Sequence, residues 1–83
     1  MIKVLFFARL REELGCEQLD IEWSPQLADV DILRQQLYER GSTWEASLGA
    51  DNVICAVNQV QVNATQALSD GDEVAFFPPV TGG

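Results

Sequence analysis

Residues 73–83 read EVAFFPPVTGG, and this closing stretch decides how the rest of the chain is interpreted. Its first five residues, EVAFF, have the apolar and aromatic composition of a β-strand. Pro78 and Pro79 then fix two φ angles, remove two N–H donors and favour an extended path. The sequence ends with Val80, Thr81, Gly82 and Gly83. Because glycine has no Cβ, a carboxylate at the end of this pair fits a slot too narrow for any side chain.

A chance ending in glycine is the simpler alternative. At an average glycine usage of about 7%, roughly one chain in 200 ends in two glycines by chance. The pair gains weight because it follows a strand and a stiff Pro-Pro spacer. We therefore predict a folded domain at residues 1–77 and an extended Gly-Gly tail at residues 78–83, which at roughly 3.3 Å per residue spans about 20 Å.

Size and charge exclude several classes of protein. A chain of 83 residues forms one domain, without room for a second core. Its 47% hydrophobic and 22% charged residues are typical of a folded, soluble protein. The net charge of −8 repels phosphate backbones and anionic membranes, so we expect neither nucleic-acid nor membrane binding. Without a long apolar run or a signal-peptide pattern, the expected location is cytoplasmic.

The chain also lacks the usual groups of a self-contained catalyst. It contains no histidine, the commonest general base and metal ligand, and no Gly-rich phosphate loop. Cys16 and Cys55 are far apart and match no metal or redox spacing, and Cys55 lies in an apolar run that predicts a core position. We expect no metal site and no tightly bound cofactor. The sequence indicates a protein that is acted upon by others or docks with them.

Periodicity predicts five strands, at residues 2–8, 17–23, 53–57, 60–62 and 73–77, and three helices, at residues 9–14, 29–40 and 42–48. The second helix is the one long helix, with Asp29 as its N-cap. Ser42 and Glu45 fit a capping box for the third helix. The first and last strands are strongly apolar, so we expect them to pair in parallel at the centre of the sheet.

Strand alternation predicts an aromatic patch. If Ile2, Val4, Phe6 and Ala8 of the first strand face the core, Phe7 faces outward. On the last strand Val74 and Phe76 share one face, which leaves Phe77 on the other. Parallel pairing then places Phe7 and Phe77 on the same outer face, beside the start of the tail. The patch is a candidate docking surface, unless the short helices cover it.

The chain resembles ubiquitin-like β-grasp proteins in three features: the order of its elements, its long helix, and the stretch DGDEVAFFPPV at residues 70–80 followed by a Gly-Gly end. More closely, the chain resembles the family of small, sulfur-carrying subunits of molybdopterin synthase. The similarity includes MIKVLFFA at 1–8, LRQQL at 33–37, AVNQ at 56–59 and GDEVAFFPPVTGG at 71–83, and is least specific at 41–52. It implies an α+β, β-grasp fold with a mixed sheet of about five strands over one long helix plus short helices.

The resemblance also implies a chemistry. A separate activating enzyme uses ATP to adenylate the carboxylate of Gly83, and a sulfur donor converts it to a thiocarboxylate. The tail then enters the large synthase subunit, where sulfur passes to a pyranopterin precursor and where the catalytic residues are expected. By position, Gly83 is the modified residue and Gly82 the narrow neck. The residues that the resemblance implies for contact with the large subunit are Phe7, Phe77, Pro78, Pro79, Val80 and Thr81. The implied assembly is a heterotetramer of two small and two large subunits.

Other functions remain open at this point. The same tail suits a sulfur carrier for thiamin or another acceptor, a ubiquitin-like protein modifier, or an interaction module without chemistry. Gln61 stands where an apolar contact with the large subunit is expected. Lys3 is the only lysine, which leaves few amines to capture an activated acyl group.

Overall fold

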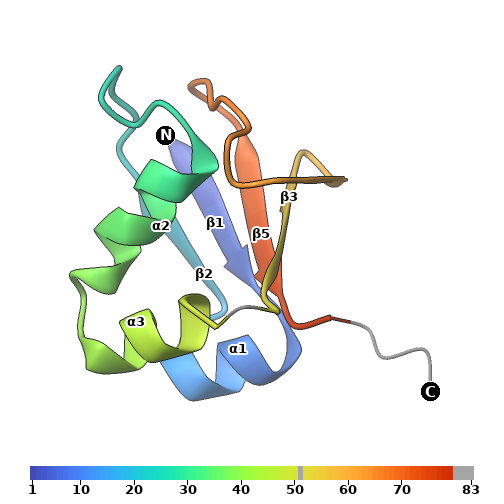
Figure 1. Cartoon of the computed structure of the whole chain (residues 1–83). Helices are drawn as coiled ribbons and strands as arrows, with labels where there is room; N and C mark the ends of the chain where they lie inside the picture. Colours follow the sequence, from blue (N-terminus) through green and yellow to red (C-terminus); the bar gives the residue numbers. More distant parts are fainter. Residues whose placement is uncertain (51, 80–83) are drawn as a thin grey trace.

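The structure is a computed structural model that describes residues 1–50 and 52–79. The chain forms, in order, β1 (Ile2–Phe6), α1 (Ala8–Leu14), β2 (Gln18–Ile21), α2 (Val30–Tyr38), α3 (Ser42–Leu48), β3 (Ile54–Val57), β4 (Val60–Val62) and β5 (Glu73–Phe77). Figure 1 shows the three helices gathered on one side of the strands. None of these helices has the length and apolar character that a bilayer crossing requires.

The strands form one mixed sheet in the order β2-β1-β5-β3-β4. β1 and β5 pair in parallel, and the other neighbours pair antiparallel. The prediction that the first and last strands meet in parallel at the sheet centre is therefore confirmed. β5 is the middle strand and is hydrogen-bonded to a neighbour on each side, and Pro78 and Pro79 follow directly after it.

The core lies between the sheet and the helices. Val4 and Phe6 of β1 and Val74 and Phe76 of β5 are almost completely buried, whereas the alternate residues of both strands are not. The Phe6 ring stacks on Phe76 with centroids 6.1 Å apart and meets the edge of Trp44 at 5.5 Å. Each such buried side chain contributes about 1.5–3 kcal/mol to folding. The buried residues of each strand therefore face the helices. Among the residues described, no helix packs on the opposite face of the sheet.

Asp29 caps α2 as expected, because the backbone N–H of Ile32 donates to its Oδ1 at 2.9 Å. The prediction of one long helix is not confirmed. α2 has nine residues against seven in each of the other two helices, and the backbone N–H groups of Glu39, Arg40 and Gly41 each donate to the carbonyl three residues earlier. Such i→i−3 bonds tighten the end of a helix into a turn.

Two local predictions were wrong. Ala8 does not face the core: β1 ends at Phe6, and Ala8 is an exposed residue with φ +53° that opens α1. The capping box at Ser42 does not form, because Gly41 is the N-cap of α3 and no side chain caps this helix. Gly41 has φ +150°, a conformation that glycine adopts without the steric cost of a Cβ.

The β3–β4 hairpin offers a test of backbone strain. Asn58 and Gln59 have φ of +50° and +70°, the pattern of a type I′ turn, whose second position favours glycine. We expect Gln59→Gly to raise the free energy of unfolding by about 1 kcal/mol, or roughly 4 °C in Tm. Urea denaturation followed by circular dichroism measures the change.

The neighbouring residue supplies the matched control. The side chain of Asn58 accepts a hydrogen bond from the backbone N–H of Glu73 and donates one to Asp72, both at 3.0 Å. Asn58→Gly relieves similar strain but removes both bonds, so a net loss of about 1 kcal/mol is expected. Equal stability changes in the two variants would contradict this account of the hairpin.

Candidate docking face and tail root

One face of the sheet is apolar at its centre and has no helix packed on it among the described residues. We call this set of side chains the open face: Leu5, Phe7, Ile54, Ala56, Ala75 and Phe77. Cross-strand register places Leu5 beside Ala75, Ala75 beside Ala56, and Ile54 beside Phe77. Ala56 is buried between its neighbours, whereas Phe7 is 45% exposed and the remaining four are half-buried. A contiguous apolar surface on a small protein marks a contact site.

Phe7 is held firmly at this face although it lies outside β1. Its backbone N–H donates to the carbonyl of Phe76 at 3.1 Å, and its carbonyl accepts from Leu10 at 3.2 Å. The first bond extends the β1–β5 ladder by one residue, and so brings Phe7 next to Phe77. The short helices leave Phe7 exposed, so they do not cover the predicted patch.

The sheet surface that contains the open face changes from charged to apolar along β1 and β5. Lys3 of β1 stands in register with Asp20 of β2 and Glu73 of β5, at the start of the parallel strand pair. The aromatic residues Phe7 and Phe77 lie at the other end. A partner that covers this whole side of the sheet therefore contacts the apolar open face close to the end of β5 and charged side chains near the beginning of β5.

The start of the tail lies at the aromatic end of the open face. β5 ends at Phe77, and Pro78 and Pro79 are half-buried. The other predicted tail residues, Val80, Thr81, Gly82 and Gly83, lie outside the described residues. Gln61 of β4 is exposed and in register with Ala56, so it borders the open face as a polar residue.

Sequence reasoning placed Phe7 and Phe77 outward but did not include Ile54 and Ala56 in the patch. The run VICAV at residues 53–57 is apolar at every position, so its sequence does not show the face to which each residue points. The register of β3 against β5 resolves it, because cross-strand partners share a face. Only this register separates Cys55, which faces the helices with Phe76, from Ile54 and Ala56 on the open face.

The Cys55 thiol is placed as a structural group. Cys55 is buried, as predicted, and its Sγ donates to the carbonyl of Val62 at 3.3 Å. Burial raises the pKa of the Cys55 thiol, and the nearby charge of Arg34 opposes this in part. A raised pKa keeps the thiol neutral and unreactive. Over residues 1–50 and 52–79, no group of three or more candidate side chains is placed to hold a metal ion.

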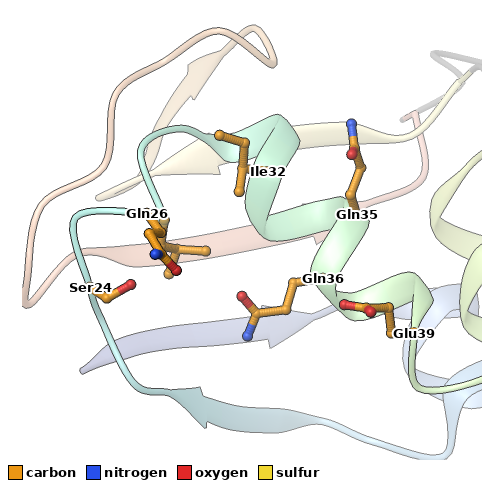
Figure 2. A pocket seen from close by; sticks show the side chains of 7 residues that line it. Ser24, Gln26, Ile32, Gln35, Gln36 and Glu39 are labelled. Carbon is orange, nitrogen blue, oxygen red and sulfur yellow. The ribbon is translucent and has the colours of Figure 1, made fainter.

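A groove lies on the helical side of the molecule, between α2 and the loop that precedes it. Figure 2 shows the side chains that line it: Ser24, Gln26, Leu27, Ile32, Gln35, Gln36 and Glu39. These side chains are mostly polar and uncharged, and none belongs to the open face. The groove is therefore separate from the surface that leads to the tail.

Comparison with known proteins identifies the family. The ThiS family model matches residues 4–83. The molybdopterin synthase sulfur carrier subunit of Escherichia coli (strain K12) is 45% identical over 83 residues, with complete coverage of both chains. Among solved structures, SAMP1 from Haloferax volcanii aligns with a TM-score of 0.81 at 26% identity, covering 99% of this chain and 98% of that one.

A second solved structure contains two proteins. It is the complex of subunits 1 and 2 of the molybdopterin-converting factor from Helicobacter pylori 26695, and one of its chains aligns with a TM-score of 0.69 at 29% identity, covering 99% of this chain and 97% of that one. The mixed sheet and its neighbours confirm the predicted α+β, ubiquitin-like β-grasp fold. With a match along its whole length, the chain belongs to the ThiS family of ubiquitin-like sulfur carriers.

Proposed function

We propose that this chain is the sulfur carrier subunit of a molybdopterin synthase in molybdenum cofactor biosynthesis. The observation that carries the proposal is the 45% identity, across the full length of both chains, to a curated carrier of this kind. The open face beside the start of the tail supports it, because a carrier needs a surface by which catalysts recognise it.

The proposed chemistry takes place at Gly83. A free carboxylate is a poor acyl donor, so an activating enzyme couples it to AMP from ATP and releases pyrophosphate. Hydrosulfide supplied by the sulfur donor then forms a C–S bond as the C–O bond to AMP breaks; AMP leaves, the S–H proton passes to solvent, and a thiocarboxylate remains. Gly82 forms the neck that allows the end to enter a narrow active site. The protein needs no acid-base group for these steps, in keeping with a sequence that contains no histidine.

The proposed partner is the large synthase subunit, which receives the tail and supplies the catalytic residues. The Helicobacter pylori complex of subunits 1 and 2 supports such a pairing for a similar small subunit. On this chain the contact consists of Phe7 and Phe77 of the open face and of Pro78, Pro79, Val80 and Thr81 of the tail. The assembly expected from the resemblance is a heterotetramer of two small and two large subunits, located in the cytoplasm.

A protein modifier is the second candidate. The likeness to SAMP1 favours it, because related solved structures describe SAMP1 as a small archaeal modifier protein. A modifier uses the same activated glycine but joins it to an amine of another protein, so the two functions differ in the product.

Intact mass spectrometry distinguishes the candidates. The full chain is incubated with a molybdopterin-type activating enzyme, ATP and a sulfur donor. We expect the mass to rise by the difference between one sulfur and one oxygen atom, and to return to its original value when the large subunit and the pyranopterin precursor are added. A stable conjugate to other proteins would favour the modifier. An unchanged mass, under conditions that charge a known carrier, would favour an interaction module without chemistry.

A further inference from the structure

The central strand of the sheet stops where two prolines begin. β5 is paired in parallel with β1 on one side and antiparallel with β3 on the other. Its last residue is Phe77, and the half-buried Pro78 and Pro79 are not part of the strand. Figure 1 shows the chain leaving the sheet beyond the end of β5. The register on each side identifies the backbone groups that these two residues would meet if the strand continued.

On the β1 side, residue 78 is the next donor in the ladder. Bonds in a parallel pair are evenly spaced and slanted, so a residue donates to the residue before its register partner and accepts from the residue after it. The N–H of Lys3 donates in this way to the carbonyl of Asp72 at 3.0 Å, and the N–H of Phe7 to the carbonyl of Phe76 at 3.1 Å. The carbonyl of Phe7 would therefore accept from residue 78, but a proline there has no N–H.

The acceptor for that missing bond is held in place. The carbonyl of Phe7 accepts from the N–H of Leu10 at 3.2 Å in the first turn of α1, and a carbonyl oxygen has a second lone pair. β1 cannot offer more than this one further acceptor, because Ala8 has φ +53° and turns the chain into α1. An N–H at residue 78 would thus add one last bond to the parallel ladder.

On the β3 side, the same count leads to residue 79. Bonded and non-bonded pairs alternate along an antiparallel ladder. The N–H of Asn58 donates to the carbonyl of Glu73 at 2.8 Å, so every second residue of β5 from Glu73 onward has its backbone groups directed to β3. Residue 79 is next in that series, opposite Asn52, and is again a proline. The acceptor is less well placed on this side, because β3 begins two residues after Asn52.

The two prolines have to be adjacent to produce this effect. Successive N–H groups of a strand point to opposite neighbours, so one proline withholds a donor from one side only. Two consecutive prolines withhold a donor from both neighbours of a central strand. Their rings also fix φ near −65°, away from the value of about −120° that parallel strands adopt. For these reasons proline is hardly ever found inside a central strand.

We propose that Pro78 and Pro79 are positioning residues, which end the central strand at Phe77 because they withhold the next ladder donor on each side. Residues 78 and 79 then belong to the tail and not to the sheet. At about 3.3 Å per residue, pairing of these two residues would shorten the tail available to a partner by about 7 Å. The consequence for catalysis rests on the proposed function, since it concerns how far Gly83 reaches into an active site. The hydrogen-bond count does not depend on that function.

Hydrogen exchange of the chain alone tests the pairing. Pro78→Ala and Pro79→Ala each restore an N–H group, whose exchange is followed by NMR. One backbone hydrogen bond corresponds to about a fivefold change in population. The new amide at position 78 should therefore exchange at least about fivefold more slowly than in an unfolded peptide, with a smaller effect at position 79. Pro25→Ala is the matched control, because Pro25 lies exposed in a turn outside the sheet and its new amide should exchange at about the unfolded rate.

Kinetics with the activating enzyme test the consequence for the tail. Full-length chains made by chemical synthesis carry either alanine or N-methylalanine at position 78. Both lack the proline ring, and they differ in the N–H that only alanine possesses. Release of pyrophosphate in the presence of ATP gives KM and kcat for each chain. A paired tail is a population that the enzyme cannot use, so the alanine chain should have a KM about fivefold higher than the N-methylalanine chain, with kcat equal within about twofold.

The two measurements decide the proposal together. It is overturned if the new amide at position 78 exchanges at the unfolded rate, because the strand would then end there without the prolines. It is also overturned if that amide is protected but the two synthetic chains have the same KM. If the amide is protected and no chain, the wild type included, supports pyrophosphate release, the hydrogen-bond count is upheld and the proposed function fails.

Discussion

Deleting Gly83, or adding one residue after it, is expected to abolish sulfur transfer while the fold remains intact. Either change moves the reactive carboxyl group by one residue, which is about 3.5 Å. A displacement of only 1 Å at a reacting centre can cost about 100-fold in rate, so activity should fall below detection. The measurement is the yield of molybdopterin from the pyranopterin precursor, with purified large subunit and activating enzyme.

Three controls separate chemistry from folding. Thermal unfolding should give the wild-type Tm for both length variants, because the described core ends with β5. Binding to the large subunit, measured without precursor, should persist in part through the open face. Gly83→Ala keeps the length but adds a methyl group, and so distinguishes the position of the carboxyl group from the width of the slot. Sulfur transfer at the wild-type rate by the shortened chain would refute the assigned role of Gly83.

Local sequence signals predicted much of the fold because they act between residues close in the chain. Asp29 lies three residues before the N–H that it accepts from, so its capping role depends on little else. Gly15 directly follows the predicted first helix, and its φ of +63° is the left-handed conformation that glycine favours at a helix end. The pairing of the first and last strands joins residues far apart in the chain, but the strongly apolar composition of both strands indicated their central, parallel position.

The errors arose where contacts between distant residues decide the outcome. β1 ends at Phe6 because the positive φ of Ala8 turns the chain into α1, although the Phe7 N–H still donates to the carbonyl of Phe76. The run VICAV has no visible period, so only pairing with β5 shows that Ile54 and Ala56 belong to the open face. The sequence resemblance, and not the geometry of the described residues, assigns the chemistry to Gly83.

Replacing either aromatic residue of the open face should weaken binding to the large subunit. Phe7 and Phe77 lie side by side next to the start of the tail. Truncation of a central aromatic contact typically costs 2 kcal/mol or more, so Phe7→Ala and Phe77→Ala should each raise Kd by roughly 30-fold. Isothermal titration calorimetry against the purified large subunit gives the values.

Matched variants test whether the effect belongs to this face. Ile32 on α2 is 39% exposed, close to the 45% of Phe7, and Val60 on β4 is 63% exposed. Val60 is in register with Val57, which faces the helices, so neither control residue belongs to the open face. Ile32→Ala and Val60→Ala should leave Kd within about twofold, since energetically important contacts are confined to a small part of a surface. If all four variants weaken binding equally, or if Phe77→Ala also unfolds the domain, the open face is not the docking surface.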